Sequence, residues 1–246
     1  MIPSKQLKNL SPSLYLRPNF QSMNPETKLL GLLILMGVFA WVSPWLAWRK
    51  IQSLEKKHGS KLLVRGITGE QAAKIILLRG EISQVNVDET SLIFANHYSA
   101  HEPAIKLSSE VYYGKRLFDV ARAARLAGHA LQHRDRQYGK LSAWESLIVF
   151  WGNTWPLFLL LSLFTKSRLL SAIVVFAVIT TFLMLMHFLK YSQIRDAAAR
   201  GEIVLTEAKL LEGHPTDEID SAFKVACLDY LALPYTRTWW KWMFFK

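Results

Sequence analysis

Three long apolar stretches constrain this chain more than any other feature of its sequence. They cover residues 29–48, about 147–164, and 169–189. The first holds roughly 20 residues without a charge, which is the helix length needed to cross the hydrocarbon core of a bilayer. A short polar turn at 165–168 separates the second stretch from the third. The pattern predicts three transmembrane helices, of which the last two form a hairpin.

Charge and cysteine content narrow the class of protein further. The formal net charge is +11, and Cys227 is the only cysteine, so no internal disulfide can form. A basic, apolar chain suits a partnership with the lipid bilayer, whose inner surface is anionic. No RNA- or DNA-binding motif is present, so we expect no nucleic-acid partner. Lysine and arginine gather beside the spans on one side, which predicts an integral, multi-pass membrane protein with its central domain and C-terminus in the cytoplasm.

The spans divide the chain into five predicted parts. These are a flexible tail (1–28, with Met1 or Met23 as the start), transmembrane helix 1 (29–48), a soluble domain (49–143), the transmembrane hairpin (144–189) and a C-terminal helical region (190–246). In the soluble domain we expect helices at 69–79, capped by Thr68, and at 115–137. Short strands are predicted at 83–87, 91–95 and 104–107, with a turn at 88–90. The C-terminal region reads as a helical hairpin to 233, broken at 213–215, followed by an aromatic and lysine-rich tail.

The second predicted helix of the domain contains a defective version of a metal-binding motif. Residues 125–133 read Arg-Leu-Ala-Gly-His-Ala-Leu-Gln-His. In a peptidase helix of the H-E-x-x-H type, two histidines bind zinc and the glutamate acts as general base. Here His129 occupies the second histidine position, but Arg125 occupies the first and Leu126 replaces the glutamate. An arginine cannot lose its proton to bind zinc, and a leucine cannot take a proton from water.

The order of motifs around this helix identifies a known family. The chain has Thr-Gly at 68–69, Asn-His-Tyr at 96–98, Leu-Ser-Ser-Glu-Val-Tyr-Tyr-Gly at 107–114 and Gly-His-Ala-Leu-Gln-His at 128–133. In this respect it resembles the neutral zinc metallopeptidase family of bacterial membranes, the YugP type, as a divergent member with a degenerate H-E-x-x-H motif. The resemblance implies a zincin-like α+β domain between membrane helices. It also implies a third metal ligand near the end of the last span, where this chain has Lys190.

The fold class that follows is a mainly α membrane protein with a small α+β zincin-like domain, three transmembrane helices and a C-terminal helical hairpin. For function we expect a pseudo-peptidase without a catalytic residue or cofactor, which binds a peptide or membrane protein along a strand edge at 91–95 and 104–107. The alternative is an active membrane zinc metallopeptidase with non-standard ligands. A third interpretation is a lipid-surface binder driven by the tail at 239–246.

Two alternatives concern individual side chains. His129, His133 and His187 are the candidate metal ligands if the site has migrated by one helical turn. The plainer interpretation is that His129 packs or forms hydrogen bonds and His133 begins the polar end of the helix. Arg125 either replaces the metal's charge by pairing with Asp119, Glu110 or a carboxylate of the C-terminal hairpin, or lies exposed on the surface.

Overall fold

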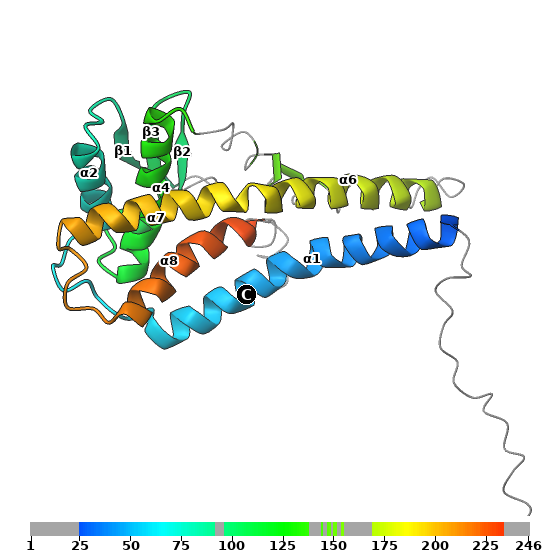
Figure 1. Ribbon diagram of the computed structural model, residues 1–246, viewed down its shortest axis with the longest axis horizontal. Helices are drawn as coiled ribbons and strands as arrows, with labels where there is room; N and C mark the ends of the chain where they lie inside the picture. Colours follow the sequence, from blue (N-terminus) through cyan, green and yellow to red (C-terminus); the bar gives the residue numbers. More distant parts are fainter. Residues whose placement is uncertain are drawn as a thin grey trace, which may run out of the picture.

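Two long helices extend from one end of the molecule and carry much of its apolar surface. The computed structural model describes residues 25–91, 96–137 and 169–233, together with 144, 147, 148, 150, 151 and 154. Helix α1 (Pro25–His58) runs beside α6 (Leu169–Leu189), and the first residues of both helices lie at the same end (Figure 1). The rings of Phe39 and Phe188 meet at a centroid distance of 5.2 Å between them. Large apolar side chains on both helices are more than half exposed, including Phe39 and Phe182.

This arrangement bears on the predicted membrane spans. Among the described residues, one helical run, Ala177–Glu207, is long and apolar enough to cross a membrane by length and composition. It consists of the second half of α6 and the helix that follows, α7 (Tyr191–Glu207), with Lys190 at the junction. The span at 29–48 stays a prediction. Most of the stretch at 147–164, the tail at 1–24 and the tail at 239–246 lie outside the described residues.

The domain that contains the sheet lies at the opposite end, and its first helix is α2 (Gly69–Arg79). Thr68 caps this helix as predicted. Its hydroxyl oxygen accepts from the backbone N–H of Gln71 at 3.2 Å, and the Gln71 side chain accepts from the backbone N–H of Thr68 at 3.0 Å. This reciprocal pair satisfies two of the backbone donors that a helix start leaves open. The buried face of α2, which includes Ile76, packs on helix α4 (Leu117–Arg134).

The domain also contains a three-stranded sheet, in which β3 lies between β1 and β2. Strands β1 (Asn86–Glu89) and β3 (Ala104–Leu107) are parallel, whereas β2 (His97–Ser99) pairs with β3 in antiparallel orientation. The predicted strand at 104–107 is confirmed, but it is the centre of the sheet and not an edge. The prediction for 83–87 was wrong in its bounds, because 88–89 belong to the strand and Thr90 still donates to the Leu107 carbonyl. Residues 92–95 of the third predicted strand lie outside the described residues.

Polar residues misled the turn prediction for a simple reason. In β1 only Val87 is buried, and its neighbours Asn86, Asp88 and Glu89 face solvent. An edge strand with one covered face tolerates such residues, so polarity at 88–89 did not mark a turn.

Helix α4 (Leu117–Arg134) forms the centre of the domain and is buried over most of its length. It starts two residues later than predicted because Arg116 is extended, with φ of −73° and ψ of 146°, and the Lys115 carbonyl accepts from Leu63 N at 2.8 Å. The short helix α3 (Ser109–Tyr112) precedes it. Helices α2, α7 and α8 (Thr216–Leu231) pack around α4, and α8 also lies along α1 (Figure 1). The expected C-terminal hairpin is present as α7 and α8, and its loop contains Gly213 at a φ of 91°.

Candidate functional site

The degenerate motif lies where α4 and α7 cross in close contact. A side chain on Gly128 would overlap the Ala197 carbonyl oxygen, and one on Gly201 would overlap the carbonyl of Ala124. Small residues at both crossing points let the two backbones touch. As a result the side chain of Arg125, between the two contact positions on α4, is carried into the interior of the helix cluster.

Burial is nearly complete at all three positions of the motif. The exposed fractions are 4% for Arg125, 1% for Leu126 and 1% for His129. The surface interpretation of Arg125 was therefore wrong. Leu126 belongs to the main hydrophobic core, which spans the domain and the C-terminal hairpin.

A chain of hydrogen bonds fixes the orientation of His129. The Gln132 amide nitrogen donates to Asp196 Oδ2 at 2.7 Å and to the Gln193 carbonyl at 2.9 Å, so its Oε1 is left to accept. His129 Nδ1 lies 2.8 Å from this oxygen and must therefore carry the proton. Burial, together with the positive charge of Arg125, lowers the pKa of His129 to about 3. The imidazole is thus neutral, with its lone pair on Nε2.

Arg125 does not take part in the ion pairs that the sequence suggested for it. Its Nε and Nη1 atoms are buried without a hydrogen-bond partner. Within the described ranges no ion pair includes Arg125, so the predicted pairs with Asp119, Glu110 or a carboxylate of the C-terminal hairpin are absent there.

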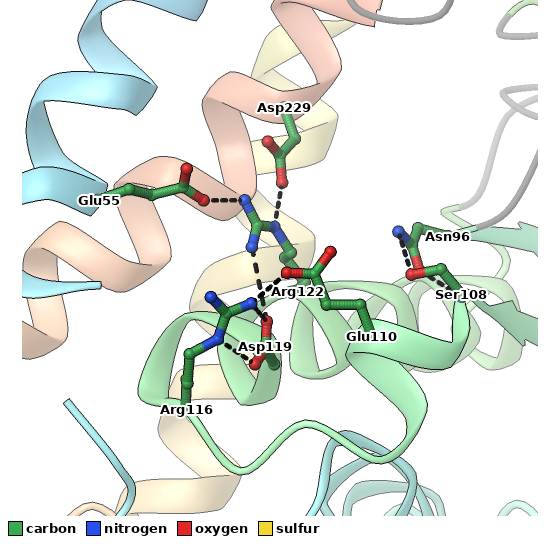
Figure 2. Close-up of polar contacts among 8 residues, drawn as sticks. All are labelled: Glu55, Asn96, Ser108, Glu110, Arg116, Asp119, Arg122 and Asp229. Atoms are coloured by element: carbon green, nitrogen blue, oxygen red, sulfur yellow. Dashed lines mark hydrogen bonds and ion pairs between the residues drawn. The ribbon is translucent and has the colours of Figure 1, made fainter. Parts of the chain in front are cut away.

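Arg122, one helical turn earlier, pairs instead with Asp119 and with a carboxylate of the C-terminal hairpin (Figure 2). Its guanidinium lies 2.6 Å from Asp229 on α8, 2.6 Å from Glu55 on α1 and 3.7 Å from Asp119 on its own helix. Arg116 holds Asp119 through two hydrogen bonds of 2.7 and 2.9 Å. Arg116 also contacts Glu110 in α3. We call Glu55, Glu110, Arg116, Asp119, Arg122 and Asp229 the interhelical ion cluster.

Sequence reasoning missed this cluster, and the available signal was weak. Asp229 stands between apolar residues of α8, where a carboxylate requires a partner, but nothing in the sequence places Glu55 beside it. Figure 2 also shows Asn96 and Ser108, which link the start of β2 to the start of α3. Asn96 Oδ1 accepts from Ser108 N at 2.8 Å, and Asn96 Nδ2 donates to Ser108 Oγ at 3.1 Å.

The remaining candidate residues occupy separate places. His133 Nδ1 lies 2.7 Å from the Tyr98 hydroxyl of β2. His187 Nε2 lies 2.9 Å from the Tyr230 carbonyl, and the two rings stack at a centroid distance of 4.0 Å. Lys190 stands at the junction of α6 and α7. In the part of the chain that is described, no group of three His, Cys, Asp or Glu side chains is placed to hold a metal ion, so His129, His133 and His187 are not assembled into a metal site.

A cavity of about 600 Å³ opens where the residues before β1 and β3 meet Tyr98 of β2 and the end of α4. Tyr98 and His133 line it together with Val85. Its charged lining residues are Glu81, Arg134 and Arg136.

Comparison with known proteins supports the family that the motif order indicated. The sequence model of the family described as "putative neutral zinc metallopeptidase" matches residues 32–239. The chain is 23% identical over 206 residues to the "Putative membrane protease YugP" of Bacillus subtilis (strain 168), and the match covers 82% of this chain and 89% of that protein. No solved structure matches.

Proposed function

Because the chain belongs to the family of putative neutral zinc metallopeptidases, we propose that it is a membrane-embedded member without hydrolytic activity, which acts by binding a peptide segment. The observation that carries this proposal is the burial of the Arg125 and Leu126 side chains. These residues lie on α4 at the positions of the family's first zinc ligand and general base. Both side chains are at most 4% exposed, so neither position offers room for a reacting water.

The donor set at the expected positions does not fit a zinc ion. A catalytic zinc needs three protein ligands, and the chain offers His129, with Arg125 and Lys190 at the other two positions. Both replacements are cations that cannot donate a lone pair while protonated, and a buried guanidinium beside His129 repels a dication. No metal-dependent step is therefore assigned to this chain.

The membrane arrangement is part of the proposal. The relative's name, a membrane protease, and the apolar run Ala177–Glu207 support membrane association. We propose that the stretches at 29–48 and 147–164 span the bilayer as well. The exposed apolar face of α1 beside α6 supports the first of these. With the basic residues concentrated near the soluble domain, that domain and α8 would face the cytoplasm.

The peptide-binding role rests on the cavity of about 600 Å³ between the sheet and the end of α4. A pocket beside a sheet can select the side chains of an extended segment. Glu81 also lines the cavity and Arg134 already pairs with Asp135, so Arg136 is the cation that favours a segment with an acidic side chain. Binding of an acidic fluorescent peptide should weaken roughly fivefold, about 1 kcal/mol, in Arg136→Gln. Arg79→Gln, an exposed change on α2, is the matched control. Equal weakening in both variants would argue for general charge attraction and against this cavity.

One observation favours the alternative, an active metallopeptidase with non-standard ligands. The Gln132 contact leaves the His129 lone pair on Nε2, which is how a hydrogen-bonded second residue orients a zinc-binding histidine. We interpret this as a retained feature of the family helix, because His133 and His187 are held by Tyr98 and Tyr230.

Bound metal separates the two functions. We would measure zinc by elemental analysis on the detergent-purified chain and on the triple variant Arg125→His, Leu126→Glu, Lys190→Glu. The proposal predicts an empty native chain and zinc uptake by the variant. About one zinc per native chain, removed by His129→Ala together with peptide cleavage, would establish the alternative instead.

A further inference from the structure

Arg125 leaves a positive charge in the protein interior that the described residues do not neutralise. Arg125 is only 4% exposed, and its Nε and Nη1 atoms lack hydrogen-bond partners. The guanidinium stays protonated at any physiological pH. Asp119 of α4 and Asp229 of α8 are already engaged, by Arg116 and by Arg122 respectively. A buried charge without a partner costs several kcal/mol, so an external anion would bind here with unusual advantage.

A second observation points to where such an anion enters. A cavity of about 480 Å³ lies between α7 and α8, lined by residues that include Tyr191, Arg195, Ala198, Lys224 and Cys227. We call it the α7–α8 cavity. Ala198 follows Ala197, the residue whose backbone touches α4 at Gly128, so one wall of the cavity belongs to the helix that packs on α4. Burial raises the pKa of the Cys227 thiol; the positive charges of Arg125 and Arg195 oppose that shift, and the carboxylates of Asp229 and Glu202 add to it. Arg125 and Arg195 therefore both lie within electrostatic reach of Cys227.

The charges of this cavity are separated along its length. Helices α7 and α8 are consecutive and pack side by side, so Tyr191 and Cys227 mark the end nearest α6. Glu202 and Asp220 mark the other end, where burial and the charge of Asp220 raise the pKa of Glu202. Arg195 and Lys224 line the cavity without an ion pair within the described ranges. The end nearest α6 is therefore cationic.

Distance from the apolar helix indicates the kind of anion. Helix α6 ends at Leu189, and Tyr191 and Arg195 follow after two and six residues. At 1.5 Å per helical residue these positions lie about 3 and 9 Å beyond the apolar segment. The headgroup layer of a bilayer is roughly 5–8 Å thick on each side. If α6 spans the membrane as proposed above, Tyr191 lies within this layer and Arg195 just beyond it, from where its long side chain can reach back to the lipid phosphates. Basic pockets at this level bind anionic headgroups.

We propose that the α7–α8 cavity binds the phosphate group of an anionic phospholipid. Arg195 and Lys224 contact the phosphate at the rim, and the uncompensated charge of Arg125 attracts it from below. An arginine pairs with phosphate through two parallel N–H donors, so the rim supplies geometric selection as well as charge. The inference depends on the membrane arrangement of the proposed function and not on whether the chain hydrolyses peptides.

Cys227 supplies a direct test, because it lines the cavity and is the only cysteine of the chain. We would measure the rate at which N-ethylmaleimide, an uncharged thiol reagent, modifies the full chain in a neutral detergent. A short-chain phosphatidic acid at ten times its Kd should slow the reaction roughly tenfold, since the reagent reacts only with the empty cavity. This protection should fall at least threefold in the double variant Arg195→Gln, Lys224→Gln, and also in Arg125→Met, but not in the control Arg79→Gln.

The comparison ligands decide between sources of protection. Equal protection by short-chain phosphatidylcholine would show that acyl chains alone fill the cavity and would overturn the proposal. Equal protection by inorganic phosphate would overturn the assignment of a lipid as the ligand. Absence of protection by every ligand would overturn the site itself. The zinc measurement on the native chain reports separately on the peptidase proposal, so the two failures are distinguishable.

Discussion

Replacing Arg122 with methionine removes the centre of the interhelical ion cluster while keeping an unbranched apolar stem. Arg122 is 13% exposed, and its loss leaves Asp229 and Glu55 without the contacts of 2.6 Å that each makes to it. Removing one partner of a buried pair costs about 3–5 kcal/mol. Asp229 and Glu55 are 29% and 38% exposed and regain some hydration, and Asp119 keeps Arg116, so the lower end applies. We expect a loss of about 3 kcal/mol, equivalent to a fall in Tm of roughly 6–12 °C.

The assay is thermal unfolding followed by tryptophan fluorescence of the detergent-purified chain. Arg65→Met is the control, since Arg65 and Glu212 form an ion pair with both side chains more than half exposed. Such a pair contributes at most about 1 kcal/mol. The double variant Arg122→Met, Asp229→Leu should recover part of the loss, because an apolar pair leaves one fewer buried charge. A single variant no less stable than the control, or a double variant in which the two losses simply add, would refute this reasoning.

Three further changes test other parts of the structure. Gly128→Val should lower stability by about 1–3 kcal/mol, because its side chain meets the Ala197 carbonyl; an unchanged Tm would contradict the close helix crossing. Thr68→Ala should cost about 1 kcal/mol through loss of the cap with Gln71, whereas Thr68→Ser should restore it. Unfolded His129 binds a proton near pH 6.5 but the folded form binds it only near pH 3, so stability should fall on acidification through this window by up to about 1.4 kcal/mol per pH unit. His129→Gln should remove this contribution, and an identical pH profile of Tm in that variant would rule it out.

The sequence predicted those parts of the fold that depend on local patterns. Thr68 with Gln71 three residues later marks a helix start by chemistry that involves only neighbouring residues, and that helix is confirmed at 69–79. Strand 104–107 was also predicted from the sequence, and three of its four residues are buried in the structure. The order of the strands was not visible, because it depends on which strand pairs with which across the domain.

The candidate site was predicted in its residues but not in their surroundings. Arg125 and Arg122 are both arginines on one helix, three residues apart, and the sequence does not tell which of them meets the carboxylates. The answer depends on the placement of α8 and α1 around α4. Arg122 points to Asp229 and Glu55, whereas Arg125 enters the interior near Cys227. The same placement seats His187 against Tyr230, 43 residues later, which no spacing argument reveals.

A site helix that no longer coordinates a metal still needs something to hold it among its neighbours. In a zinc enzyme the ion joins α4 to the helix that carries the third ligand, so loss of the ligands would separate the two unless other contacts suffice. Here the contacts of Gly128 with Ala197 and of Gly201 with Ala124 join α4 to α7 through backbone packing. Gln132 adds hydrogen bonds to Gln193 and Asp196 of α7. Arg122 joins α4 to α8 and α1 through charge. Neither set involves a ligand position, so Arg125, Leu126 and Lys190 can differ from the family pattern while the fold stays intact.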